Sequence, residues 1–373
     1  MLRAGSDYRS GFEAAFRFDI GAALERIVAP VTLVGRRGDL FASHAGRLAG
    51  GIAPTAIEDE DEPSSAIWRL LGDTLPAAPA PAPPNSGFSD TRPSRTYVPT
   101  SRGGLLARSE PGRGRPLVML HASPTSSVLL LPLMRELSGA RPIVSFDTLG
   151  NGDSAKPDPT TQLTIRDLAT TVGEAIDELG IGDFDLYGSH TGSLTAMELA
   201  IQRPQDNDLI LAGVTMFDDS NRPDLISRAD ALERYLPAYE PAWDGTHLLW
   251  AWNFRRSFTL YWPWYDRTPA GIRHVPMVAL EAFHAAFVEF LKSGPTYHVP
   301  YRAALEYPTR ARLPLLETRT LIGTQADGPL QAYTNEAVSL APHAIGITLP
   351  DGADDVAAAY DEFLTASSET AHR

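Results

Sequence analysis

Short apolar runs alternate with amphipathic stretches over the C-terminal three quarters of the chain. Runs of strand length occur at 116–121, 142–146, 184–188, 209–217, 318–323 and 344–349. Between them, residues 164–180 and 191–203 carry apolar side chains at helical spacing. Continuous apolar runs are typical of parallel strands that are covered on both faces. The pattern therefore predicts an α/β fold with a mostly parallel sheet and helices on both faces.

Residues 221–308 interrupt this alternation. They contain no clear strand, and five of the six tryptophans fall within 243–264. We expect a helical cap here, inserted between two core segments at 95–220 and 309–373, because open α/β sheets bind ligands at the strand ends that such a cap would cover. The aromatic side chains fit either a ligand pocket or the cap's own core.

The N-terminal part carries a second signal. Residues 76–94 are rich in Pro and Ala and predict an extended linker. Residues 1–75 resemble the C-terminal third of the chain: "TLVGRRGD" at 32–39 parallels "TLIGTQAD" at 320–327. We interpret this segment as a partial repeat, which could extend the sheet, form a homodimer contact or be an inert remnant of a gene fusion.

Composition narrows the functional classes. The chain has a net charge of -14 and no cysteine, which excludes disulfides and thiolate metal sites and argues against nucleic-acid or anionic-membrane partners. It has no apolar run of about 18 residues, and its first residues lack the pattern of a signal peptide. We expect a cytoplasmic protein that acts on a small molecule and needs no cofactor.

Three motifs follow one another along the chain: "LHASPTSS" at 120–127, "FDTLGNGDSAKP" at 146–157 and "LYGSHTGSLTAMELA" at 186–200. They resemble the oxyanion loop, the Asp-x-x-Gly loop and the nucleophile elbow of the α/β-hydrolase fold superfamily. The cap stretch "DGTHLLWAWNFRRSF" is similar to that of a capped subgroup with His-Thr-Gly at the elbow.

The resemblance implies site residues. The nucleophile position falls on His190 and the acid on Asp327, while Asp219 lies where some members carry their acid. The last histidine of the triad would lie within 349–364, which contains none. The oxyanion donors would come from Thr191 and from the loop of Ala122 and Ser123.

Histidine at the elbow also suggests other chemistry. His121 and His190 should face one pocket, where two imidazoles could move protons or, with a third group, bind a metal. Asp147 and Asp219 could orient them. In the cap, His247, Trp250 and Phe254 share one helical face and Arg255 lies beside it, which suggests a carboxylate-bearing or enolate-like substrate.

These observations predict a hydrolase or lyase without the usual Ser-His-Asp triad that acts on a small carbonyl compound. His190 would be its general base, acid or nucleophile. Two alternatives stay open: a catalytically inactive binding or scaffold protein, and an enzyme with a metal held by histidine and carboxylate.

Overall fold

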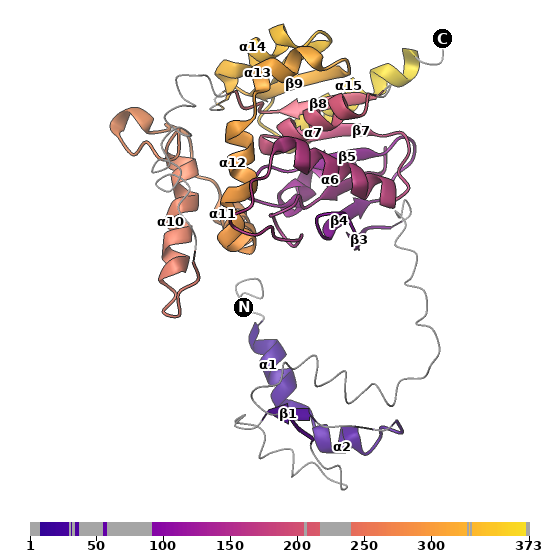
Figure 1. Ribbon diagram of the computed structural model, residues 1–373, viewed down its shortest axis with the longest axis vertical. Coiled ribbons are helices and arrows are strands. Elements are labelled where there is room, and N and C mark those ends of the chain that lie inside the picture. The colour runs from indigo at the N-terminus through magenta and orange to yellow at the C-terminus, as the bar shows by residue number, and fades with distance from the viewer. Residues whose placement is uncertain are drawn as a thin grey trace. The chain divides into compact units, whose positions relative to one another are not determined.

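The computed structural model describes residues 8–29, 31, 34–36, 55–57, 92–204, 207–216, 240–326, 328 and 330–370. The chain divides into two compact units, Met1–Pro84 and Asn85–Arg373. In the first unit, helices α1 (Tyr8–Arg17) and α2 (Ile20–Leu24) precede two strands, β1 (Val34–Arg36) and β2 (Thr55–Ile57). Figure 1 labels α1, α2 and β1, and the two strands pair in parallel.

The pairing in the first unit bears on the predicted repeat. Gly35 lies opposite Ala56 in the parallel pair β1–β2, and Gly323 lies opposite Ile347 in the parallel pair β9–β10 of the second unit. Two parallel strands in both places are what a partial repeat requires. The repeat itself stays a prediction.

An eight-stranded sheet forms the centre of the second unit, in the order β10-β9-β8-β7-β5-β6-β4-β3. All strands run parallel except β4, which is antiparallel to both of its neighbours, β3 and β6. The strands are β3 (Ser94–Val98), β4 (Leu105–Glu110), β5 (Leu117–Leu120), β6 (Ile143–Phe146), β7 (Asp185–Ser189), β8 (Asp208–Ala212), β9 (Arg319–Gln325) and β10 (Ala344–Leu349). The predicted mostly parallel sheet is confirmed.

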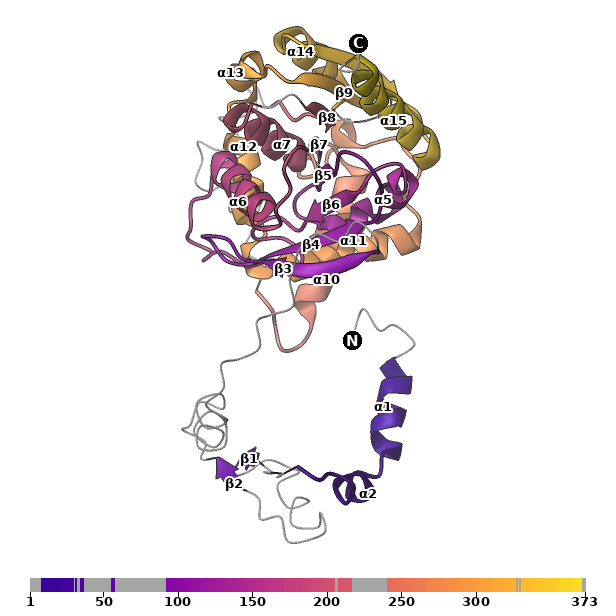
Figure 2. The same cartoon turned by 90° about the vertical axis from the view of Figure 1, so that its right-hand side faces the viewer.

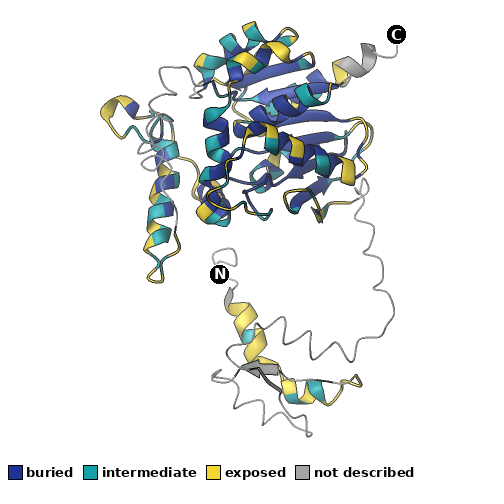
Figure 3. Ribbon diagram, in the orientation of Figure 1, coloured by how far each residue is buried: buried dark blue, intermediate teal, exposed yellow. Residues whose placement is uncertain are grey.

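Helices cover both faces of this sheet because its strands alternate their buried side chains between two cores. Leu117 and Met119 point to the core under α5 (Leu131–Leu137) and α15 (Ala353–Thr370), whereas Val118 and Leu120 point to the core under α6 (Ile165–Glu178) and α7 (Thr191–Gln202). Figure 2 shows the two pairs of helices on opposite sides of the sheet. The central strands are buried throughout (Figure 3).

Between β8 and β9 the residues that the structure describes form helices and no named strand. The described part of this segment contains α10 (Thr246–Leu260), α11 (Leu280–Ser293), α12 (His298–Glu306) and α13 (Thr309–Arg312), and α14 (Gln331–Leu340) follows β9. Residues of α10, α11 and α12 share an aromatic core of their own. Among the described helices, none combines the length and the apolar content of a membrane span.

Candidate active site

The turn between β7 and α7 carries His190 at its tip. Its backbone has φ 50° and ψ -112°, and it is the one residue other than glycine with positive φ in the described part of the chain. Its N–H donates to the Ala212 carbonyl at 2.9 Å, and its carbonyl accepts from the Ser193 N–H at 2.9 Å. Such a conformation is strained for a residue with a side chain and persists only where the surrounding structure holds it.

A glycine makes this sharp turn compatible with the sheet. A Cβ on Gly192 would lie 2.2 Å from the carbonyl oxygen of Leu120 in the neighbouring strand β5. Only glycine allows the start of α7 to approach the sheet so closely. Close packing against β5 therefore explains why position 192, two residues after His190, is a glycine.

The turn projects the His190 side chain into a cavity of about 480 Å³. The ring lies beside Gly213, where an added Cβ would be 3.2 Å from the ring Cε1 and 3.3 Å from Nδ1. The cavity wall removes solvation from the ring, and this desolvation, together with the positive charge of Arg273, holds the His190 pKa below its ordinary value. His190 is therefore neutral at neutral pH, as a general base must be.

The cavity has a core wall and a cap wall. The core wall comes from the end of β9, from the start of α7 and from loops that follow strands, with His121, Ala122, Ser123, His190, Thr191, Thr215, Thr324 and Gln325. The cap wall comes from α10, the segment that follows it and α12, with Arg255, Phe258, Trp262, Arg273, Tyr301, Ala304 and Leu305. Its volume suits a small-molecule ligand.

His121 also lies at the cavity, but both of its ring nitrogens are engaged. Nε2 accepts from the Thr148 N–H at 3.0 Å, so Nδ1 carries the proton and donates to the Ala122 carbonyl at 2.8 Å. Burial is the main cause that lowers the His121 pKa, and it outweighs the opposing charge of Asp147. The expected proton transfer through His121 would have to break one of these two hydrogen bonds.

The hydrogen bond from His121 helps to fix the loop of Ala122 and Ser123, which is the predicted oxyanion loop. The Ala122 carbonyl also accepts from the side chain and the N–H of Thr125. In a trans peptide the next N–H points the opposite way, so three donors on this carbonyl direct the N–H of Ser123 away from them. The Thr191 N–H, at the first position of α7, has no carbonyl within its own helix. Both residues line the cavity that contains His190.

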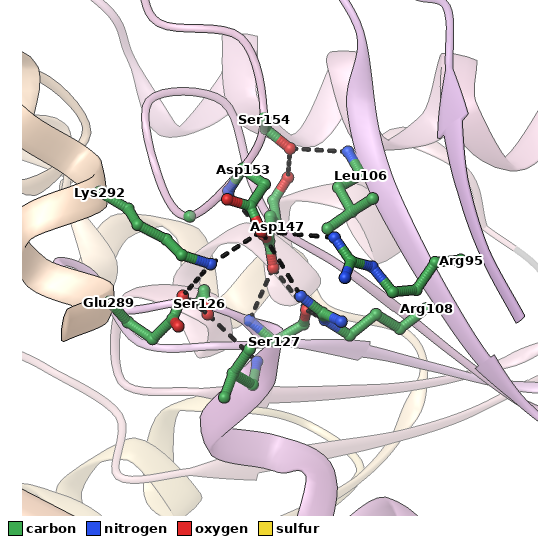
Figure 4. A network of polar contacts seen from close by, with 12 residues as sticks. Arg95, Leu106, Arg108, Ser126, Ser127, Asp147, Asp153, Ser154, Glu289 and Lys292 are labelled. Atoms are coloured by element: carbon green, nitrogen blue, oxygen red, sulfur yellow. Dashed lines mark hydrogen bonds and ion pairs between the residues drawn. The ribbon is translucent and has the colours of Figure 1, made fainter. Parts of the chain in front are cut away.

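Asp147, expected to orient the histidines, lies elsewhere. Its buried carboxylate accepts from the N–H and hydroxyl of Ser127 and from the N–H of Asp153 at 2.8 Å. It does not belong to the cavity lining. Asp147 therefore holds the loops that follow β5 and β6 in their positions (Figure 4).

The same network joins these loops to the cap. Lys292 on α11 pairs with Asp153 at 2.7 Å and with Glu289 at 3.0 Å, and Glu289 accepts from the Ser126 hydroxyl at 2.7 Å (Figure 4). Glu289 is 1% exposed. A buried ion pair with an additional hydrogen bond fixes geometry more than it adds stability, so this contact sets where α11 meets the loop that carries Ser123.

The cap residues predicted to bind substrate have different positions. Trp250 and Phe254 stack at 5.1 Å within the aromatic core of the cap. The Nδ1 of His247, in the first turn of α10, accepts a hydrogen bond at 2.9 Å from the N–H of Ala242, which precedes the helix. None of these three lines the cavity. Of the four predicted cap residues, Arg255 is the one that does.

The structure adds residues that the sequence did not single out. Trp262, Arg273 and Tyr301 all line the cavity opposite His190. Burial raises the pKa of the Tyr301 hydroxyl, which stays protonated. Arg273 follows a Pro-Ala-Gly turn and has no motif around it, so no local signal identifies it.

Two predicted carboxylates, Asp219 and Asp327, lie outside the described residues. Within the described part of the chain, no side chain hydrogen-bonds the His190 ring, and no three histidine or carboxylate side chains converge as metal ligands do. Asp219 and Asp327 stay predictions.

Comparison with known proteins gives distant relatives. No protein-family model matches the chain. A haloalkane dehalogenase from Agrobacterium fabrum is 26% identical over 192 residues, which cover 50% of this chain and 58% of the relative. An (E)-2-((N-methylformamido)methylene)succinate hydrolase from Acinetobacter baylyi is 29% identical over 127 residues, 34% of this chain and 48% of the relative. The chain thus spans about half the length of these curated relatives.

Solved structures resemble the chain over more of its length. A loop variant of the haloalkane dehalogenase DbeA from Bradyrhizobium elkanii superposes with a TM-score of 0.56, covering 76% of this chain and 100% of that one at 19% identity. A putative lipase from Acinetobacter baumannii gives a TM-score of 0.56, covering 83% and 98% at 14% identity. The chain has the α/β-hydrolase fold. In enzymes of that fold the turn at this place is the nucleophile elbow, and in this chain its tip is His190; the role of His190 stays a prediction.

Proposed function

We propose that the chain is an α/β-hydrolase-fold enzyme that hydrolyses a small carbonyl compound, with His190 in place of the usual serine. The observation that carries this proposal is the strained backbone of His190, whose side chain projects into the cavity. A glycine would adopt this turn without strain. A reactive imidazole would explain why this strained position carries a histidine instead of a glycine. The two curated relatives, a dehalogenase and a hydrolase of a succinate derivative, are both hydrolases.

In this mechanism neutral His190 acts as a general base. It removes a proton from water as the water oxygen attacks the carbonyl carbon. The oxyanion of the tetrahedral intermediate accepts from the N–H groups of Thr191 and of the loop of Ala122 and Ser123. The intermediate then expels the leaving group, which takes the proton from the imidazolium. Direct attack by the imidazole, with an acyl-imidazole intermediate, uses the same donors.

The other predicted residues support this chemistry in different ways. His121 is a positioning residue, because its Nδ1–H holds the Ala122 carbonyl and thereby the oxyanion loop. Asp327 or Asp219 would orient the His190 ring and stabilise its protonated form, as a carboxylate partner does for other catalytic histidines. Carbon–carbon bond cleavage next to a carbonyl needs the same base and the same oxyanion donors.

One experiment distinguishes the proposed enzyme from a binding or scaffold protein, because only the enzyme would turn over substrate. The activity of the full chain is measured on a panel of esters, lactones and diketones, beside His190→Ala and His284→Ala. His284 lies on the exposed side of α11 and does not line the cavity. We expect turnover that falls by about 100-fold or more in His190→Ala, the range of general-base catalysis, and stays at the parent level in His284→Ala.

A binding or scaffold protein would turn over none of these substrates. Equal activity of the His190→Ala variant and the parent would refute the role of His190. Labelling of any serine by a fluorophosphonate probe would contradict the absence of an activated serine. Loss of activity on removal of a stoichiometric metal from the purified protein would instead support the metal-dependent alternative, with His190 as a ligand.

A further inference from the structure

Two arginines of the cap share one anchor at the cavity. The guanidinium of Arg255 lies over the ring of Phe258, 5.2 Å from its centroid, and the guanidinium of Arg273 donates to the Phe258 carbonyl at 3.1 Å. The backbone adds to this anchor, because the Arg273 N–H donates to the Leu260 carbonyl at 2.8 Å. One residue therefore holds both positive charges, one through its ring and one through its carbonyl oxygen.

The charges of this pair are not balanced within the cavity lining. None of the described residues that line the cavity is acidic. Neither Arg255 nor Arg273 forms an ion pair with a described carboxylate, whereas other half-buried arginines of the chain do, such as Arg312 with Glu198 at 2.9 Å. The Nε of Arg255 is buried and has no hydrogen-bond partner. Desolvated cations without a counter-ion are unfavourable.

The rest of the wall indicates what kind of anion would fit. Around the two arginines the cap wall is apolar or aromatic, with Phe258, Trp262, Ala304 and Leu305. A small ion that needs complete hydration does not suit such a wall. An organic molecule with an apolar body and one planar anionic group does, since guanidinium groups bind carboxylates with two parallel hydrogen bonds.

We propose that Arg255 and Arg273 form a carboxylate subsite, so that the substrate of this enzyme is a partly apolar organic acid whose carboxylate is held by the cap while its carbonyl group lies at His190. This inference rests on the proposed function for the position of the reacting group, but the subsite itself does not. The overall charge of -14 makes the site notable, because the chain as a whole repels anions and the cavity concentrates positive charge.

Occupancy of the subsite changes the electrostatics of His190. The positive charge of Arg273 is one of the two causes that hold the His190 pKa low, after desolvation. A carboxylate bound to Arg273 offsets that charge, so the His190 pKa rises when the subsite fills. The base then binds its proton more readily when an anionic substrate is present.

The test measures binding, not turnover. Isothermal titration of the full-length His190→Ala variant, which cannot use the proposed base, compares 4-phenylbutanoate with its neutral isostere 4-phenylbutanamide and with 3-phenylpropyl phosphate. We expect the carboxylate to bind about tenfold or more tightly than the amide, since charge-assisted hydrogen bonds are about twice as strong as neutral ones. Arg255→Gln and Arg273→Gln should each reduce that preference, while Arg255→Lys should retain part of it.

Arg256→Gln is the matched control, because Arg256 is the exposed neighbour of Arg255 and does not line the cavity. It should leave the preference unchanged. Equal binding of the carboxylate and the amide, no binding of the carboxylate at millimolar concentration, or an equal loss in Arg256→Gln would overturn the subsite. Tighter binding of the phosphate would overturn the assignment to carboxylates.

A second readout uses the protein with His190 intact. The His190 pKa, followed by NMR of its ring, should rise on addition of 4-phenylbutanoate and stay unchanged with the amide. An unchanged pKa at saturating carboxylate would place the anion away from Arg273 and refute the inference. Because the titration needs no turnover, inactivity toward every carbonyl substrate refutes the proposed function without affecting this result.

Discussion

Replacement of His190 by glycine separates the stability of the elbow from its chemistry. The backbone of His190, at φ 50° and ψ -112°, lies in a region that glycine occupies without strain. A residue with a Cβ there costs about 1 to 3 kcal/mol. Glycine gains more conformational freedom in the unfolded chain, which offsets about 0.5 to 1 kcal/mol. The side chain is exposed to the cavity, so its removal loses little packing.

The comparison with His190→Ala isolates the strain. Alanine removes the imidazole but keeps the Cβ, so it stays strained. We expect His190→Gly to be about 1 kcal/mol more stable than His190→Ala, while both lose the turnover that depends on the ring. Urea unfolding followed by tryptophan fluorescence, with one m-value fitted to all variants, gives the difference from the transition midpoints.

A glycine variant that is no more stable than the alanine variant would refute the interpretation of the elbow as strained. A glycine variant that keeps the parent's activity would refute the catalytic role of His190. The two readouts are independent, because stability reports the backbone and turnover reports the imidazole.

Three further predictions test other parts of the structure. Gly213→Ala should cost about 1 to 2 kcal/mol for its φ of 69° and should also reduce turnover, because its Cβ would lie 3.2 Å from the His190 ring. Gly180→Ala has a φ of 68° and open space around its Cβ, so in the same unfolding and activity assays it should show the stability loss alone. Glu198→Ala should lower the free energy of unfolding by about 3 to 5 kcal/mol, since it leaves the Arg312 guanidinium without its buried partner; urea unfolding of Glu198→Gln, which keeps a hydrogen bond to Arg312, should show a smaller loss. Turnover should rise with pH as His190 loses its proton, with a midpoint below about pH 6.5, the ordinary histidine value, because the His190 pKa is lowered; a midpoint at or above that value would contradict the neutral base.

We expect the loss of folding stability at acid pH to depend on the protonation of His121. The folded state holds its ring neutral, with Nε2 accepting from Thr148, so the unfolded chain binds a proton more readily. Stability is therefore complete above the unfolded pKa of about 6.5 and is lost as the pH falls from there toward the lowered folded pKa. The same hydrogen bonds that keep His121 out of proton transfer make it a point of acid sensitivity.

The sequence predicts the central sheet well because its parallel strands are buried on both faces. Both β5 and β6 are buried throughout; β5 is a continuous apolar run, and β6 is apolar except for the buried Ser145. The strands β3 and β4, which pair antiparallel to each other, were not predicted. In "SRTYV" and "LLARSE" polar side chains interrupt the apolar pattern, since β3 lies at the sheet edge with alternating exposure and β4 carries Arg108 and Glu110.

Some residues of the candidate site could likewise be predicted from the sequence, and others could not. His190, Thr191 and the loop of Ala122 and Ser123 follow strand ends, where the order of motifs fixes their position. The cap residues depend on packing that leaves no periodic signal: Trp262 lines the cavity and Trp264, two residues further on, is buried in the cap core. The helical pattern ends at Leu260, so spacing along the chain no longer indicates which side chain turns inward.

If His190 is the base and the two arginines bind the substrate, as we propose, then Arg273 connects the cap to the proposed chemistry at His190. An α/β-hydrolase fold with serine at the elbow relies on a partner histidine to activate it, and the stretch 349–364 provides none. A histidine at the tip needs no such partner, but it must be neutral to act as a base and must then hold the proton it removes. Desolvation and the positive charge of Arg273 satisfy the first requirement. A carboxylate on Arg255 and Arg273 would satisfy the second, because it offsets the charge that opposes the imidazolium. Substrate binding and proton transfer would then depend on the same residue, Arg273, which predicts that Arg273→Gln weakens carboxylate binding and moves the acidic limb of the pH profile upward together, whereas Arg256→Gln changes neither.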